Sequence, residues 1–177
     1  AREAGLTRAA VWKRIDALRE AGVGIEASPG RGYRLEQPLD LLDADAIRAG
    51  LPASMQGGLA GLEISWSLDS TNSELLRRDT PASGCAVLLA ERQTGGRGRR
   101  GRAWASPLAA HVYLSLARRF DGGLARLGGL SLVAGVATST LTLAPTFNLA
   151  LVSWAVCPSG QRLEYRELEP ITYTDAE

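Results

Sequence analysis

The apolar and polar positions of the first third of the chain predict two elements. One apolar residue in every three or four between Thr7 and Ala21 marks one face of a helix that Thr7 caps. This stripe consists of Val11, Ile15 and Leu18. Gly22 and Gly24 end the helix. Residues 23–26 and 32–35 then alternate around a Ser-Pro-Gly turn, a pattern typical of a short hairpin.

This order of elements predicts a winged helix-turn-helix module. Residues 1–6 are typical of the end of a shorter helix and a tight turn, so the segment gives helix, turn, helix and hairpin. In such modules the second helix enters the major groove of DNA. The candidate DNA contacts are Thr7, Arg8, Lys13 and Arg31. The alternative is a small helical domain with a solvated charged face, because residues 1–50 hold eight basic and eight acidic side chains.

The middle of the chain predicts an alternation of strands and helices after a connecting segment, residues 36–60, that contains a short helix at 43–48. Residues 62–68 alternate as a strand, and the hydroxyl and amide side chains of residues 69–72 can cap a helix that runs to Arg78. Residues 85–90 form a continuous apolar run, which predicts a buried strand. A further strand at 111–116 precedes an apolar helix that opens near Leu127.

Positive charge is concentrated in the loop after the second of these strands. Seven arginines and no acid occur from Arg92 through Arg119, and four of the arginines alternate with glycines in residues 96–102. Glycine lets the backbone approach a ligand closely, and arginine offers paired donors to an anion. Trp104 and Pro107 could close over a ring system. The alternative is a basic tail that contacts RNA, but a single copy between two apolar strands favours a pocket wall.

These segments together carry a resemblance to a known family. The chain resembles the bifunctional biotin protein ligases that also repress the biotin operon. The residues that carry it are Thr7-Arg8-Ala9-Ala10-Val11-Trp12-Lys13, Gly30-Arg31-Gly32-Tyr33, Ser70-Thr71-Asn72, Gln93, the run Gly96-Arg97-Gly98-Arg99-Arg100-Gly101-Arg102, Trp104, Tyr113-Leu114-Ser115 and Gly129-Leu130-Ser131-Leu132. Lipoate ligases share the fold, but the glycine-arginine run matches the biotin family better.

The resemblance implies a fold and a reaction. The expected fold is α+β: an N-terminal winged helix-turn-helix followed by a mixed α/β biotin/lipoate-ligase-like catalytic domain, truncated. The family joins biotin to ATP, which comes with Mg²⁺, and then passes the biotinyl group to a lysine of the biotin carboxyl carrier protein of acetyl-CoA carboxylase. The implied domains are 1–38 (the winged helix, incomplete at its N-terminus), 39–60 (a linker), 61–137 (the first part of the ligase domain) and 138–177 (a divergent tail).

The resemblance also implies roles for individual residues. Arg97 and Arg99 would act in catalysis by separating the biotin carboxylate from the α-phosphate. The residues implied to bind biotin and its adenylate are Ser70, Thr71, Asn72, Gln93, Arg97, Gly98, Arg99 and Trp104. A plain helix cap is the alternative for residues 70–72. His111, within a predicted strand, has the character of an ordinary core or surface residue.

The match stops after Ala137. The family's Lys-Trp-Pro-Asn-Asp string is missing, and its lysine, which touches the biotin carboxylate and the α-phosphate, has no counterpart because Lys13 is the one lysine among 20 basic residues. No further strand of the sheet is expected, and residues 127–161 carry no charge. A membrane span conflicts with the proline, asparagine and hydroxyl residues of this run. We therefore take a shifted reading frame over 138–177 as the hypothesis, and expect an impaired ligase.

Composition restricts the remaining possibilities. With 45% hydrophobic and 22% charged residues in 177, the chain is typical of a globular protein and not of a disordered one. The two cysteines form no disulfide or metal-binding pattern, and the sequence predicts a cytoplasmic protein without a metal site or a membrane partner. Operator DNA and the carrier protein are the expected partners, and a homodimer is possible. The alternative function is a non-catalytic winged-helix DNA-binding regulator or a degenerate ligase.

Overall fold

The computed structural model describes residues 5–96, 104–121 and 149–156, the last as the path of a strand, together with 127, 129, 130, 132, 133 and 136. The elements follow the order α1 (Arg8–Glu20), β1 (Ile25–Ser28), β2 (Gly32–Leu35), α2 (Ala44–Gly50), α3 (Ala53–Gln56), β3 (Leu59–Ser65), α4 (Thr71–Arg77), β4 (Cys85–Ala90), β5 (Val112–Arg119) and β6 (Leu149–Val156). The fold combines helices with strands, in agreement with the expected α+β class.

The N-terminal unit consists of α1 and the hairpin of β1 and β2. Thr7 caps α1, because its side chain accepts a hydrogen bond from the Ala10 amide at 3.2 Å. At the other end the Val23 amide donates to Leu18 O and the Gly22 amide to Arg19 O, so Val23 belongs to the cap. The predicted strand at 23–26 is therefore shifted to residues 25–28.

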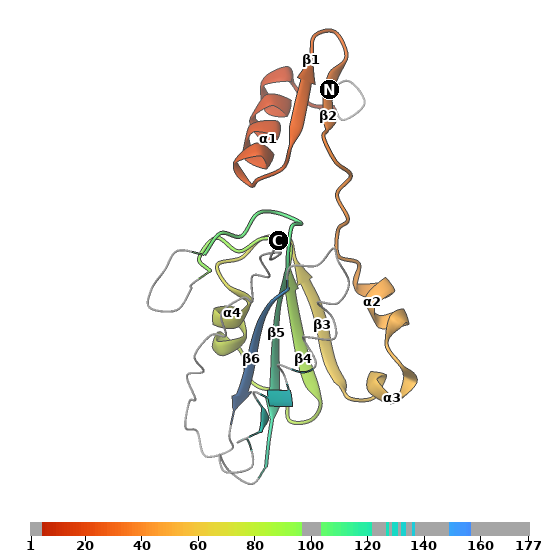
Figure 1. The fold of residues 1–177 in the computed structure, drawn as a ribbon, viewed down its shortest axis with the longest axis vertical. Coiled ribbons are helices and arrows are strands. Elements are labelled where there is room, and N and C mark those ends of the chain that lie inside the picture. Colours follow the sequence, from red (N-terminus) through yellow and green to blue (C-terminus); the bar gives the residue numbers. More distant parts are fainter. Residues whose placement is uncertain are drawn as a thin grey trace, which may run out of the picture.

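The second unit is a mixed four-stranded sheet in the order β3-β4-β5-β6 (Figure 1). β3 pairs with β4 in parallel, β4 with β5 antiparallel, and β5 with β6 in parallel. α4 packs against β4 and β5 through Leu75, which forms a core cluster with Leu88 and Ala117. This cluster fixes the helix against the middle of the sheet.

Several element boundaries differ from those that the sequence predicts. β3 covers residues 59–65 where 62–68 were expected, because Leu68 leaves the strand and pairs instead with Gln93 in an isolated parallel bridge. α2 begins one residue after its cap Asp43 and runs to Gly50, and α3 was not expected. β5 extends three residues past the predicted end at 116.

β6 corrects the expectation that no further strand of the sheet follows the apolar helix. It lies at 149–156 and pairs with β5 along the whole length of both strands. The signal was present in the sequence, since Leu-Ala-Leu-Val-Ser-Trp-Ala-Val is a near-continuous apolar run, a pattern typical of strands in parallel pairs. Residues 138–148 and 157–177 lie outside the described residues, and the shifted reading frame stays a hypothesis.

Candidate functional site

Two segments meet at the edge of the sheet where β3 and β4 end. The parallel pairing brings both carboxyl ends to the same edge. The Thr94 amide donates to Leu68 O and the Gly95 amide to Asp69 O, each at 2.8 Å. The start of α4 is thereby joined to the residues that follow β4, and the predicted site residues of the two segments come together.

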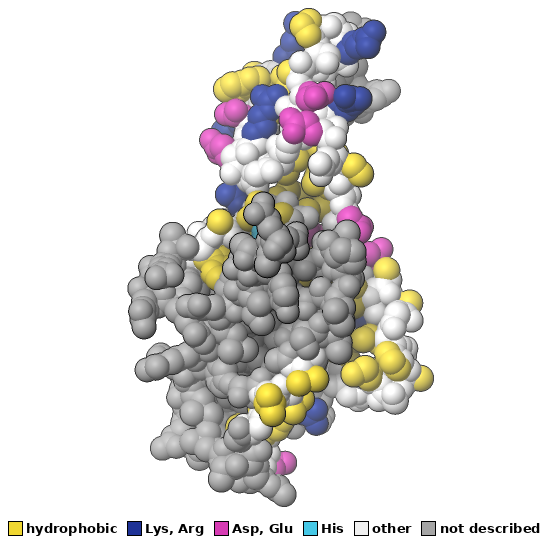
Figure 2. Space-filling model, in the orientation of Figure 1, with side chains coloured by type: hydrophobic (Ala, Val, Ile, Leu, Met, Phe, Trp, Pro, Cys, Tyr) yellow, Lys and Arg dark blue, Asp and Glu magenta, His cyan; other side chains and the backbone are white. Residues whose placement is uncertain are grey.

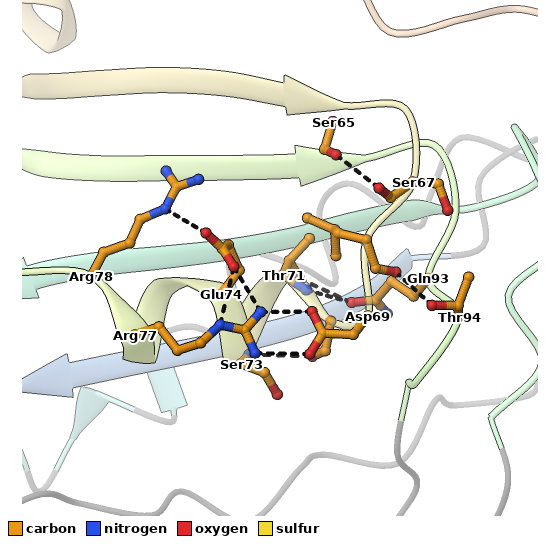
Figure 3. A network of polar contacts seen from close by, with 12 residues as sticks. Ser65, Ser67, Asp69, Thr71, Ser73, Glu74, Arg77, Arg78, Gln93 and Thr94 are labelled. Carbon is orange, nitrogen blue, oxygen red and sulfur yellow. Dashed lines mark hydrogen bonds and ion pairs between the residues drawn. The ribbon is translucent and has the colours of Figure 1, made fainter.

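A buried polar network lies at this junction (Figure 3). The Thr71 amide donates to Gln93 Oε1 at 2.8 Å, and the Thr71 hydroxyl lies 3.2 Å from the same oxygen. The Thr71 hydroxyl also lies 2.8 Å from the hydroxyl of Ser115 on β5. Thr71 and Ser115 are 1% and 0% exposed. Sequence reasoning placed Thr71 and Gln93 in the site but gave Ser115 no role, although it belongs to the matched Tyr-Leu-Ser run.

The neighbours of Thr71 play different parts. Ser70 is the N-cap of α4, because its side chain accepts from the Ser73 amide at 3.4 Å. Ser70 therefore acts as a helix cap in this structure, which is the alternative that the sequence offered for residues 70–72. Asn72 Oδ1 is buried and accepts no hydrogen bond from any residue that the structure describes. A buried acceptor without a donor is costly, and a ligand N–H group is one means of satisfying it.

The base of the glycine-arginine loop is closed by a contact between Gly96 and Trp104. A Cβ atom added to Gly96 would lie 3.1 Å from Cδ1 and 3.3 Å from Cβ of Trp104. Both ends of the loop thus touch each other next to the polar network. Arg97, Gly98 and Arg99 lie outside the described residues.

An ion-pair network fixes the first turn of α4 (Figure 3). Arg77 donates to both oxygens of Asp69, at 2.9 and 2.8 Å, and to Glu74. Arg78 links Glu74 to Glu63 on β3. The Arg77 guanidinium lowers the pKa of Asp69 from 3.8 to about 2, and Arg77 and Arg78 lower the pKa of Glu74. Asp69 directly precedes residues 70–72, so the network positions them.

We expect Asp69→Asn to destabilise the protein in a pH-dependent way. Because the folded-state pKa of Asp69 is lowered, its stabilisation is present above pH 3.8 and is lost as the pH falls towards 2. Asp69 is half exposed, which limits the loss at neutral pH to less than about 1 kcal/mol. Urea unfolding should show a difference from the unchanged chain at neutral pH that disappears at low pH. Asp40→Asn, at an exposed carboxylate without an ion pair among the described residues, should show no such difference.

The N-terminal unit contacts the segment that follows the glycine-arginine loop. The Leu108 amide donates to Ala21 O at 2.8 Å, and Leu108 forms a core cluster with Ala21, Val23 and Ile25. Glu91, 4% exposed, links the connecting segment to the same part of the chain, because its carboxylate accepts from the Leu42 amide and its carbonyl oxygen accepts from the Ala109 amide. Sequence reasoning missed Glu91, and its one signal was a charge at the end of an apolar run.

The candidate DNA contacts all lie on the surface. Thr7, Arg8, Lys13 and Arg31 are exposed, and the hydroxyl of Thr7 serves the helix cap. Figure 2 shows basic side chains of the N-terminal unit with acidic ones among them. Arg34, for example, pairs with Glu26 across the hairpin at 3.0 Å. The surface is therefore of mixed charge, as the count over residues 1–50 indicates.

His111 and the first cysteine have ordinary surroundings. The His111 ring lies 3.4 Å from the Tyr113 hydroxyl, which donates to Pro107 O, and burial lowers the pKa of the imidazole. Burial also raises the pKa of Cys85, whose thiol is free. Cys157 lies outside the described residues.

In the part of the chain that the structure describes, no group of three metal-ligating side chains comes together. No helix in that part is long and apolar enough to cross a membrane.

A helix with a hairpin wing, joined to a mixed sheet with a polar site at one edge, is the arrangement of a helix-turn-helix domain followed by a biotin/lipoate ligase domain. A model of the HTH domain matches residues 1–34, and a model of the biotin/lipoate A/B protein ligase family matches residues 65–145. The fold and these matches agree with the resemblance, and the chain is related to the bifunctional biotin protein ligases.

Three relatives illustrate the similarity. The bifunctional ligase/repressor BirA of Salmonella typhimurium is 45% identical over 132 residues, which are 75% of this chain and 39% of that protein. BirA of Escherichia coli K12 is 38% identical over 167 residues, 94% of this chain and 49% of the relative. The biotin-(acetyl-CoA-carboxylase) ligase of Mycobacterium tuberculosis is 41% identical over 111 residues, 59% of this chain and 39% of the relative. The chain thus spans at most about half the length of these relatives.

Proposed function

We propose that this chain carries the DNA-binding and biotin-binding parts of a bifunctional biotin protein ligase. Such a protein makes biotinyl-5'-AMP from biotin and ATP, transfers the biotinyl group to a lysine of the biotin carboxyl carrier protein of acetyl-CoA carboxylase, and represses the biotin operon. The observation that carries the proposal is the buried network of Thr71, Gln93 and Ser115 beside the closed base of the glycine-arginine loop.

The polar groups at this edge suit the ureido ring of biotin. That ring presents a carbonyl oxygen between two N–H groups, so it requires both donors and acceptors. Gln93 holds its oxygen towards Thr71, which leaves its Nε2 donors for a ligand acceptor. Asn72 Oδ1 is an acceptor that lacks a donor among the described residues. Ser70, which begins the same turn, completes the group proposed to bind biotin.

The glycine-arginine loop is proposed to serve the adenylation step. A carboxylate oxygen of biotin attacks the α-phosphorus of ATP, and pyrophosphate leaves. These two anions repel each other unless cations lie beside them, which is the role of Arg97 and Arg99, while Gly98 permits close approach of the backbone. Trp104 packs near the adenine, and Mg²⁺ arrives with the ATP phosphates. No general base is needed because the attacking carboxylate is already ionised.

The second step is proposed to need little from the protein. The neutral amine of the carrier lysine attacks the acyl carbon of the mixed anhydride, AMP leaves, and an amide bond to biotin forms. The same chain would bind operator DNA through residues 1–38, with Thr7, Arg8, Lys13 and Arg31 as contacts, in the cytoplasm and as a possible homodimer. Residues 39–60 would connect this unit to the ligase part at 61–137, with 138–177 as a divergent tail.

A non-catalytic DNA-binding regulator, or a degenerate ligase, is the second candidate. The observation that favours it is the absence of any lysine after Lys13 in the sequence. Arginine does not replace a lysine that acts as a compact point charge. An ammonium group that bridges the biotin carboxylate and the α-phosphate would therefore be missing, and adenylation would be slow even if biotin binds.

Mixing the chain with biotin and ATP and measuring pyrophosphate release tests this function. We expect biotin to bind and pyrophosphate to form at least about 100-fold more slowly than with the full-length Escherichia coli relative, because one charge-stabilising contact is lost. Arg99→Met should reduce the remaining release, and Arg34→Met, on the wing, should not. Weak biotin binding without adenylate, together with retained operator binding, would favour the regulator. Release at the relative's rate would contradict the proposed impairment.

A further inference from the structure

Ser115 places a hydroxyl group inside an otherwise apolar part of the sheet. It is 0% exposed, lies between Leu114 and Leu116 on β5, and stands opposite Leu88 of β4. A buried hydroxyl is costly unless it is hydrogen-bonded. Its partner is the Thr71 hydroxyl, 2.8 Å away and 44 residues distant in sequence. The pair thus links the middle of the sheet to the first residue of α4.

The direction of the hydrogen bonds in this network follows from the donors that are present. The Thr71 backbone N–H can only donate, so the side-chain atom of Gln93 that lies 2.8 Å from it is the oxygen. Gln93 Oε1 can only accept, so the Thr71 hydroxyl, 3.2 Å away, donates its one proton there. The Ser115 hydroxyl must then donate to Thr71. Three groups form one chain of bonds that runs from the sheet to the Gln93 amide.

This chain of bonds decides which end of the Gln93 amide meets a ligand. The amide and the hydroxyl of Thr71 both donate to Gln93 Oε1 and hold this oxygen towards Thr71. The Nε2 atom of Gln93 therefore faces away from Thr71. Nε2 donates to no side chain or backbone group in the part of the molecule that the structure describes. A ligand that binds beside Gln93 consequently meets two N–H donors, and it needs an acceptor there.

We infer that Ser115 is a positioning residue: by donating to Thr71 it fixes the Thr71 hydroxyl, and through it the side chain of Gln93, with the NH₂ group turned towards the ligand. The inference rests on the proposed function, in which this ligand group is the ureido carbonyl oxygen of biotin. Ser115 itself does not touch the ligand. Its effect is on binding and on the choice between ligands.

The test compares Ser115→Ala with Ala117→Gly. Ala117 lies two residues further along the same strand and on the same face, in the cluster with Leu75 and Leu88. Its replacement removes a buried methyl group but no hydroxyl, so it controls for packing. Ser115→Thr keeps the hydroxyl and should restore part of what Ser115→Ala loses.

The first measurement needs no ligand. Hydrogen exchange of the Thr71 amide and the NMR signals of the Gln93 side-chain NH₂ report whether the network holds. Ser115→Ala should speed Thr71 exchange about 3- to 10-fold relative to its neighbours on α4, the range that one hydrogen bond contributes. Ala117→Gly should leave this ratio unchanged. An unchanged ratio in Ser115→Ala would overturn the inference, whatever the chain binds.

The second measurement uses biotin and 2-iminobiotin, whose guanidinium form presents donors in place of the carbonyl oxygen. The unchanged chain should prefer biotin, and Ser115→Ala should lower both its biotin affinity and this preference by about 3- to 10-fold. A loosened network with unchanged affinity and preference would overturn the role in binding. If the unchanged chain binds neither compound while Ser115→Ala still loosens Thr71, the positioning of Gln93 stands and the proposed biotin function fails.

Discussion

Replacing Gln93 by leucine should remove most of the biotin affinity of this chain, by about 100-fold or more. The substitution deletes the two Nε2 donors that face the ligand. It also leaves the Thr71 amide and hydroxyl without the acceptor that lies 2.8 and 3.2 Å from them. An unsatisfied buried donor costs about 1–3 kcal/mol, and each lost hydrogen bond to the ligand adds about 1 kcal/mol. Isothermal titration with biotin measures the loss.

Two further variants separate the causes of this loss. Gln93→Glu keeps an acceptor for Thr71 but has no donor for a ligand, so it should preserve the network and still lose biotin affinity. Gln56→Leu removes a glutamine of helix α3, whose exposed side chain donates to Leu51 O, and this variant should bind biotin as the unchanged chain does. Full affinity in Gln93→Glu would show that Gln93 does not donate to the ligand.

Replacing Gly22 by alanine should destabilise the junction between the N-terminal unit and the sheet. Gly22 has φ of +94° at the end of α1, a conformation that costs a residue with a Cβ about 1–2 kcal/mol. The added Cβ would also lie 2.9 Å from Cβ of Pro107, in the segment that follows the glycine-arginine loop. We expect a total loss of about 2–4 kcal/mol in urea unfolding, together with faster proteolysis of the connecting residues 36–43.

Gly30 supplies the matched control. Its φ of +76° imposes a similar backbone strain, but no atom lies within 4 Å of the position of an added Cβ. Gly30→Ala should therefore lose the strain energy alone and leave proteolysis of the connecting residues unchanged. Equal losses in the two variants would mean that the contact with Pro107 contributes nothing to the stability of the junction.

Local sequence signals predicted the elements whose ends are set by their own residues. Thr7 and Ser70 cap the helices that follow them, and the apolar run at 85–90 is β4 without a shift. These features depend on contacts within a few residues, which spacing and residue type report directly. The same signals failed at β3, where Leu68 pairs with Gln93 instead of extending the strand, and at 23–26, where the Val23 amide joins the cap of α1.

The site was predicted in part. Ser70, Thr71, Asn72 and Gln93 were placed in the site through the family resemblance, because the spacing of residues 70–72 alone is equally that of a helix cap. That Thr71 turns towards Gln93 and Ser115 could not be predicted from sequence. Ser70 and Thr71 belong to one short segment, but Ser70 contacts its own helix, whereas the partners of Thr71 lie 22 and 44 residues away in the sequence.

The sequence by itself determined the order of the elements from α1 to β5 apart from α3, the cap residues, the concentration of arginine in one loop and the presence of a single lysine. The tertiary structure alone decided the contacts of Ser115 with Thr71, of Gly96 with Trp104 and of Ala21 with Leu108. A periodic pattern records which face of an element is apolar, but not which partner covers it. That partner is set by the register of the strands and by the packing of α4 on the sheet, where residues distant in sequence meet.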